Sequence, residues 1–311
     1  METSPTPQPP LRIGTRRSNL AMVQAEGIRN CLQKIAPGRS FEIEALRTLG
    51  DRDQLTALYN FGAKSLWTTE LEEKLNAGEL DVIVHCLKDM PTSLPDSCWP
   101  ALHELEEPPR GRRGRHFIRP ALSQLRRLYP HLRFANLRGN VETRLAKVDN
   151  SDSEYTCMVM SAAGLERVGL EHRISQYLGS KDGGILHAVG QGALGLEIRK
   201  GDRKMQELLG QLADQRSTLA CLAERSLMRT LEGGCSAPIG VETEWISAGA
   251  LSIHAIVVSL DGTKSVEDTI VSNVKTVEEA TALGKELAAR LVKAGAGEVL
   301  NNINANRPPK N

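Results

Sequence analysis

Cys235 is the residue whose surroundings most favour chemistry. It stands in the run Leu-Glu-Gly-Gly-Cys-Ser-Ala-Pro at 231–238. The two glycines remove side-chain bulk and permit a sharp turn after a helix, which would leave the sulfur uncrowded. A thiol presented in this way can act as a nucleophile in its thiolate form. The alternative is a small buried hydrophobe at a helix end, which is the commoner role of a free cysteine.

Asp89 is the second residue placed for chemistry. It follows the apolar segment 81–85, which is typical of a strand buried in a parallel sheet. In open α/β sheets the carboxyl ends of the strands face the ligand crevice, so a carboxylate at this position can meet a substrate. The alternative is a surface ion pair with the neighbouring Lys88, which would contribute little. The position favours a functional carboxylate.

Basic residues gather at the ends of predicted strands and near the first turns of predicted helices. Guanidinium groups near helix N-terminal amides bind carboxylates or phosphates, often through two parallel hydrogen bonds. Any one of these side chains alone could be a solvated charge, but their repeated topological position indicates an anion site. The residues concerned are Arg16, Arg17, Lys64, Arg138 and Arg144.

Two α/β lobes are predicted from alternating strands and helices, and two lobes imply a cleft between them. The first lobe has strands over 11–15, 40–46 and 81–85. Ser18 is expected to cap one helix, and 65–80 to form mostly another. The second lobe has strands over 133–137 and 157–161, with a helix over 142–148.

The last third of the chain predicts a small α+β domain. A helix over 217–231 carries leucines on one face and leads into the Gly-Gly-Cys turn. Strands over 239–244, 251–260 and 269–271, with an Asp-Gly hairpin turn, then precede a helix over 277–293. Cys235 therefore lies at the edge of a third domain.

Gly190, Gly192 and Gly195 resemble a dinucleotide-binding loop only superficially. Such a loop follows a strand and opens a helix, whereas these glycines lead into a strand. We expect a hinge crossing between the lobes here.

Composition excludes several classes of protein. The chain of 311 residues can form two or three domains, and its net charge of +1 argues against a globally basic nucleic-acid binder. No apolar stretch is long enough to span a bilayer, and residues 1–10 read as a disordered leader without a signal-peptide pattern. The six cysteines form no CxxC pair. We therefore expect a cytoplasmic protein with reduced thiols, no metal, and no nucleic-acid or membrane partner.

Six motifs, in order along the chain, resemble the porphobilinogen deaminase family, also called hydroxymethylbilane synthases. They are Gly-Thr-Arg-Arg-Ser-Asn-Leu-Ala at 14–21, Lys-Ser-Leu-Trp-Thr-Thr-Glu-Leu-Glu at 64–72, His-Cys-Leu-Lys-Asp-Met-Pro-Thr at 85–92, Leu-Arg-Gly-Asn at 137–140 with Thr-Arg-Leu at 143–145, Gly-Gln-Gly-Ala-Leu-Gly at 190–195 and Leu-Glu-Gly-Gly-Cys-Ser at 231–236.

The resemblance implies an α/β fold with two periplasmic-binding-protein-like lobes and a small C-terminal α+β domain. We place domain 1 at 11–105 and 189–212, domain 2 at 106–188 and domain 3 at 213–311, after the leader 1–10.

The resemblance also implies an enzyme of tetrapyrrole (haem) biosynthesis. Such an enzyme joins four porphobilinogen molecules head to tail into hydroxymethylbilane and releases ammonia at each step, on a covalently attached dipyrromethane primer. A cysteine suits the attachment, because loss of ammonia from an aminomethyl pyrrole leaves an electrophile to which a thiolate can add as a thioether. The implied protein is a monomer whose partner is the small-molecule substrate.

Each site residue is carried over from a matching motif position. Cys235 matches the attachment cysteine, and Asp89 matches the catalytic aspartate, whose carboxylate can accept pyrrole N–H groups and stabilise positive charge. The remaining matches serve ligands that carry acetate and propionate groups. They are Lys88 and Arg144 for the dipyrromethane cofactor, and Arg16, Ser18, Gln24, Arg138 and Lys64 for the substrate.

The resemblance breaks between Leu94 and Gln124. Family members carry here a Gly-Thr-Ser-Ser-x-Arg-Arg motif whose hydroxyls and paired arginines hold the primer, whereas this chain has an Arg-Gly run at 110–115. A basic nucleic-acid-binding arm and a disordered loop are alternatives, but a misread or mis-spliced stretch best explains the return to register. We therefore expect primer loading to be weak or absent. The alternative functions are an impaired family member and a two-lobed anion-binding protein without catalysis.

Overall fold

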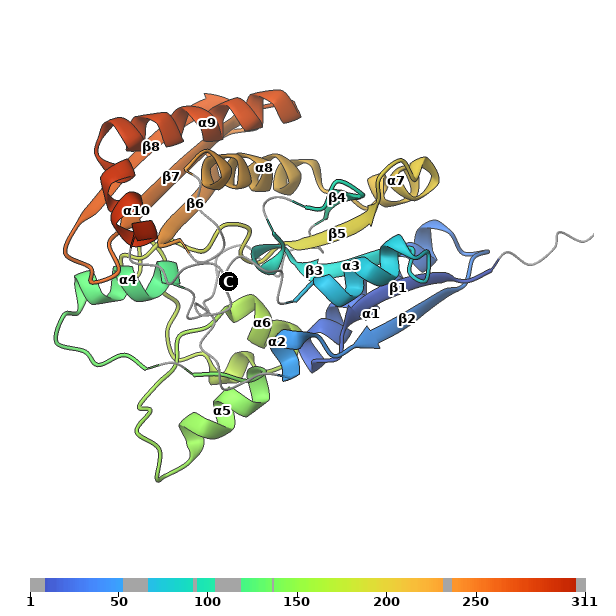
Figure 1. Ribbon diagram of the computed structural model, residues 1–311, viewed down its shortest axis with the longest axis horizontal. Coiled ribbons are helices and arrows are strands. Elements are labelled where there is room, and N and C mark those ends of the chain that lie inside the picture. The colour runs from blue at the N-terminus through green and yellow to red at the C-terminus, as the bar shows by residue number, and fades with distance from the viewer. Residues whose placement is uncertain are drawn as a thin grey trace, which may run out of the picture.

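The structure is a computed structural model that describes residues 9–52, 67–91, 94–103, 119–135, 137–231 and 237–305. Within these residues two sheets stand apart, a mixed five-stranded sheet and an antiparallel three-stranded sheet (Figure 1). The mixed α/β architecture expected from the sequence is confirmed. None of the described helices is long and apolar enough to cross a membrane.

The five-stranded sheet has the order β2-β1-β3-β5-β4. Strand β1 runs parallel to both β2 and β3, while β5 runs antiparallel to β3 and β4. The strands are β1 (Leu11–Arg16), β2 (Phe41–Leu46), β3 (Val82–Cys86), β4 (Cys98–His103) and β5 (Leu194–Arg199). As expected, the glycine-rich run at 190–195 leads into a strand, β5. This strand pairs with β4 in the sheet although ninety residues separate the two in the sequence.

Alternation along the strands places helices on both faces of this sheet. Val82 and Val84 belong to the core under α1 (Asn19–Ile35) and α7 (Arg203–Gly210), whereas Ile83 packs on the opposite side against α3 (Thr69–Asn76). Side chains two residues apart share a face in a strand, so one apolar run can fill two cores. The short helix α2 (Leu49–Arg52) follows β2 at the carboxyl end of the sheet.

The described residues between β4 and β5 include the helices α4 (Arg119–Leu128), α5 (Val141–Asp149) and α6 (Ala162–Arg167). A 3₁₀ turn, η3 (Glu171–Arg173), follows. The helix expected over 142–148 is confirmed as α5. The strands expected over 133–137 and 157–161 are wrong for the described residues, which are irregular there. A strand exists only as part of a hydrogen-bonded ladder, and no described segment pairs with either stretch.

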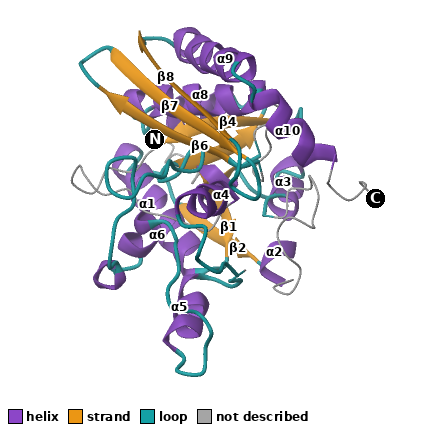
Figure 2. Ribbon diagram, turned by 90° about the vertical axis from the view of Figure 1, so that its left-hand side faces the viewer, coloured by secondary structure: helices purple, strands orange, loops and turns teal. Residues whose placement is uncertain are grey.

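The C-terminal third forms the expected α+β unit, in which β6 (Ile239–Trp245), β7 (Ala250–Val258) and β8 (Ser265–Asn273) pair in that order (Figure 2). Helices α8 (Gln215–Thr230) and α9 (Val277–Lys293) pack on the sheet through a core of leucines and valines. Thr276 and Glu279 form a capping box that starts α9. Helix α10 (Ala296–Ala305) completes the described chain.

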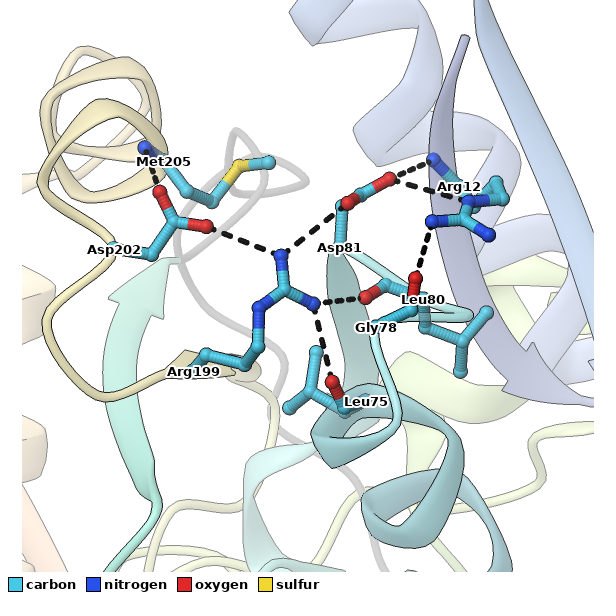
Figure 3. A network of polar contacts seen from close by, with 8 residues as sticks. All are labelled: Arg12, Leu75, Gly78, Leu80, Asp81, Arg199, Asp202 and Met205. Atoms are coloured by element: carbon cyan, nitrogen blue, oxygen red, sulfur yellow. Dashed lines mark hydrogen bonds and ion pairs between the residues drawn. The ribbon is translucent and has the colours of Figure 1, made fainter. Parts of the chain in front are cut away.

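Arg199 lies at one end of the five-stranded sheet, where its side chain forms hydrogen bonds to several segments (Figure 3). Its guanidinium donates to the carbonyl oxygens of Leu75, at 3.1 Å, and Leu80. It also donates to the carboxylates of Asp81 and Asp202, at 3.3 and 3.2 Å. One side chain at the end of β5 therefore fixes the end of α3, the start of β3 and the start of α7.

We expect Arg199→Met to lower the free energy of unfolding by about 2–4 kcal/mol, because two carbonyls and two carboxylates lose a partly buried charged donor. The midpoint of urea unfolding, followed by circular dichroism, measures the change. Exposed Arg203→Met is the matched control and should change stability by less than about 0.5 kcal/mol. Equal midpoints for the two variants would contradict a stabilising role of the network.

Candidate functional site

Asp89 ends a 3₁₀ turn, η2 (Leu87–Asp89), that follows β3 directly. The backbone N–H of Leu87 donates to Ala193 at 2.9 Å, which attaches the turn to the start of β5. Gly195 makes this close packing possible, because a Cβ there would lie 2.7 Å from the Met90 sulfur. The expected position of Asp89 beyond the carboxyl end of a central strand is confirmed.

The segment after Asp89 is also held by the C-terminal domain. Arg225 of α8 is buried and donates to the carbonyl oxygens of Met90, at 3.3 Å, and Pro91, at 2.5 Å. The adjacent Glu224 accepts a 2.8 Å hydrogen bond from the backbone N–H of Gly190. Helix α8, which leads toward Cys235, is therefore attached both to the Asp89 segment and to the crossing before β5.

The charge of Asp89 acts on both Lys88 and Arg144. Burial lowers the pKa of Lys88, the charge of Asp89 opposes that shift, and the charges of Arg144 and Arg16 reinforce it. Burial likewise lowers the pKa of Arg144 to about 10, again against the charge of Asp89 and with the charges of Arg138 and Arg16. The carboxylate thus lies among cations that come from both η2 and α5.

Arg144 is positioned by the turn that starts α5. Gly139 adopts a φ of 120°, which favours glycine, and the Asn140 side chain accepts a 2.8 Å hydrogen bond from the backbone N–H of Thr143. The Arg144 Nε donates to the Asn140 carbonyl at 3.3 Å. The Leu-Arg-Gly-Asn motif therefore acts as a helix start that aims an arginine toward the end of β3.

Trp67 joins two further cations of the site. The Arg16 Cζ lies 3.9 Å from the centroid of the Trp67 ring, and the Arg138 Cζ lies 5.9 Å from it. Arg16 also forms an ion pair with Asp51 of α2. The structure thus brings together Arg16, Lys88, Asp89, Arg138 and Arg144, as the sequence predicts.

Ser18 lies directly before α1, and Gln24 lies within this helix. Ser18 occupies the N-cap position of α1, but its hydroxyl makes no capping hydrogen bond, which corrects the expected cap. Gln24 is buried, and its amide exchanges hydrogen bonds of 3.2 and 3.3 Å with the Cys86 thiol. The neighbouring Asn19 donates to Glu142 of α5 at 2.8 Å and so links α1 to the helix of Arg144.

Cys235 and Lys64 lie outside the described residues, as do the first eight residues and the Arg-Gly run at 110–115. Chain on either side of Cys235 is described up to the end of α8 and again just before β6. The five described cysteines are free, as expected. Burial, followed by the Glu197 carboxylate, raises the pKa of Cys98 to about 12, so that thiol is a poor nucleophile.

Sequence reasoning missed Asp51, Trp67 and Arg225. Trp67 stands within a recognised motif, but its aromatic type gave no sign that two arginines would approach its ring. Asp51 and Arg225 are ordinary helix residues in the sequence, and their importance comes from contacts across 35 and about 135 positions. No periodicity or local spacing encodes such contacts.

We expect Asp89→Asn to lower the pKa of Lys88 further, because the charge that opposes the effect of burial is removed. A pH titration of the Lys88 Nζ by NMR with ¹⁵N-labelled lysine measures this shift. Exposed Asp96→Asn is the control and should leave the titration unchanged. A Lys88 pKa that stays constant or rises in Asp89→Asn would show that the carboxylate does not act on this amine.

The C-terminal and cofactor-binding parts both match one family of proteins. Residues 11–110 and 119–207 match "Porphobilinogen deaminase, dipyromethane cofactor binding domain", and residues 218–293 match "Porphobilinogen deaminase, C-terminal domain". The matched ranges include 94–110 and 119–124, so the break in resemblance is narrower than the sequence motifs suggested. The unmatched residues between these ranges are 111–118.

Curated relatives named porphobilinogen deaminase are similar over almost the whole chain. The protein of Neurospora crassa is 45% identical, over 96% of this chain and 95% of its own length. That of Saccharomyces cerevisiae is 44% identical, over 96% and 98%. That of Synechococcus elongatus is 42% identical, over 98% and 99%. From these matches and the site geometry together, the chain belongs to the porphobilinogen deaminase family.

Proposed function

We propose that the protein is a hydroxymethylbilane synthase, which condenses four porphobilinogen molecules head to tail and releases four molecules of ammonia. The observation that carries this proposal is the carboxylate of Asp89 among Lys88, Arg144 and Arg16 at the carboxyl end of β3. The cations suit a ligand with several carboxylates, and the Asp89 carboxylate suits a reacting centre that gains positive charge.

The residues present fit a dipyrromethane cofactor. The side chains of Lys88, Arg144 and Arg138 supply cationic donors. Burial, reinforced by the charges of neighbouring arginines, lowers the pKa of Lys88 and that of Arg144. Cys235, which follows α8 in the sequence, would hold the cofactor by a thioether. When bound, the cofactor supplies a pyrrole carbon that is the nucleophile for the first condensation.

Asp89 would serve as the catalytic residue. Its carboxylate can accept hydrogen bonds from pyrrole N–H groups and stabilise the positive charge that develops as ammonia departs. The rigid attachment of its turn to Ala193 and Arg225 limits motion of the carboxylate, and fixed charges stabilise a transition state without reorganisation.

The remaining residues would bind the substrate through its acetate and propionate groups. Arg16 and Arg138 offer guanidinium donors for these carboxylates, and the Ser18 hydroxyl at the start of α1 would add a polar contact. Gln24 would act from its place beside Cys86, and Lys64 would contribute from the part of the sequence between α2 and α3. The protein would act as a cytoplasmic monomer of the haem pathway.

We expect incomplete loading of Cys235, because the chain lacks the paired arginines of the Gly-Thr-Ser-Ser-x-Arg-Arg motif. Intact-protein mass spectrometry after expression measures the fraction with a dipyrromethane adduct, and Cys235→Ser is the control that should carry none. Full loading, equal to that of the Saccharomyces cerevisiae relative, would contradict this expectation and strengthen the proposed function. An adduct that persists in Cys235→Ser would contradict the attachment site.

We expect Asp89→Asn to reduce kcat by about 10²–10³-fold with little change in KM, because the carboxylate acts on charge that develops in the transition state. Ammonia release from porphobilinogen, normalised to cofactor content, measures the rate. Asp96→Asn should retain the rate of the unaltered protein. A loss confined to KM would contradict a catalytic role for Asp89, and substrate binding without any ammonia release by the unaltered protein would favour an anion-binding protein.

A further inference from the structure

Arg16 is held from two directions by residues to which the family motifs assign no role. Its Nε and one terminal nitrogen donate to the two carboxylate oxygens of Asp51, with an Nε to Oδ2 distance of 3.2 Å. Its Cζ lies 3.9 Å from the centroid of the Trp67 ring. One contact fixes an edge of the planar guanidinium and the other covers its face, so this long side chain is restricted to one orientation.

Asp51 is itself fixed from behind by Thr48. The Oδ2 atom of Asp51 accepts hydrogen bonds from the backbone N–H of Thr48, at 3.2 Å, and from its hydroxyl, at 2.9 Å. Burial alone would raise the pKa of Asp51, but the hydrogen bond and charge of Arg16, followed by the Thr48 hydrogen bonds, lower it. The carboxylate is therefore ionised at neutral pH and held by partners on both sides.

Gly50 brings Trp67 into the same support. A Cβ on Gly50 would lie 2.3 Å from the Cζ3 atom of the Trp67 ring, so the indole packs directly on the backbone of α2. The helix that carries the carboxylate therefore also fixes the ring. We call Thr48, Gly50, Asp51 and Trp67 the Arg16 bracket.

We propose that Asp51 is a positioning residue for substrate binding, which holds the guanidinium of Arg16 with its other edge toward a substrate carboxylate. The proposal rests on the proposed function, which assigns Arg16 to the substrate. The contacts to Asp51 use two of the five N–H donors of an arginine and leave the Nη1 edge for a ligand. A side chain that is already oriented loses less conformational entropy when the ligand binds.

The negative charge of Asp51 would by itself weaken the binding of an anionic substrate, which is the opposite of the effect that we propose for positioning. Asp51 is an anion close to Arg16, in a site that would receive an anionic substrate and that also holds Lys88 and Arg144. If net charge alone governed binding, loss of the Asp51 charge would strengthen substrate binding. Positioning of Arg16 requires the reverse.

Asp51→Asn is the deciding variant, studied by steady-state kinetics with porphobilinogen on the full chain and normalised to cofactor content. We expect KM to rise about tenfold while kcat stays within about twofold, because a neutral amide holds the guanidinium weakly and the reacting centre is untouched. Thr48→Val keeps the Asp51 charge but removes one hydrogen bond that holds it. This variant should raise KM about two- to threefold, in the same direction.

Glu142→Gln is the matched charge control. Glu142 is an acid whose charge acts on Arg144, and a glutamine retains an oxygen for the 2.8 Å hydrogen bond from Asn19. This variant should leave KM unchanged or lower it. Thermal unfolding midpoints within a few degrees of the unaltered protein would show that all three variants are folded.

A KM for Asp51→Asn that is unchanged or lower would overturn the proposal, as would a fall in kcat without a rise in KM. Calorimetric titration with porphobilinogen separates this result from failure of the proposed function. If the unaltered protein binds porphobilinogen but releases no ammonia, the proposed function fails, and a weaker affinity of Asp51→Asn still supports positioning. If the unaltered protein does not bind porphobilinogen, both proposals fail.

Discussion

The arrangement of the site depends on how a group of cations is held together in a partly buried place. Lys88, Arg144, Arg16 and Arg138 lie close enough for their charges to disfavour one another, and burial adds to that effect. Such a group is tolerated only where anions offset the repulsion. Asp89 and Asp51 supply part of that charge from the protein itself. The excess positive charge that is left is what a ligand with several carboxylates would neutralise.

The segments that hold these charged groups in place are far apart in the sequence. The Asp89 turn is held at the start of β5 through Ala193, and the residues that follow it are held by α8 through Arg225, while Arg144 comes from α5. The hydrogen bond from Asn19 to Glu142 links α1 to the helix that carries Arg144. An anion bound among these cations would therefore contact both the end of β3 and helix α5, and the Arg225 contacts attach α8 to the segment that follows Asp89.

Local sequence rules predicted the elements well and the long-range contacts poorly. Strand β3, helix α5 and the C-terminal sheet follow from apolar periodicity and turn chemistry, which are properties of neighbouring residues. The two strands expected between α4 and β5 were wrong because a strand needs a partner that periodicity does not name. Asp89 and the arginines were located by their position at strand and helix ends, whereas Asp51 and Trp67 act through contacts that only folding creates.

The central claim is that this cationic site performs a condensation and does more than bind anions. The most direct measurement is the stoichiometry of the reaction, with porphobilinogen consumption, ammonia release and hydroxymethylbilane formation followed together in one sample. The account predicts four porphobilinogen molecules consumed and four ammonia molecules released for each hydroxymethylbilane formed, however slow the turnover. Saturable binding of porphobilinogen with no ammonia released would contradict it.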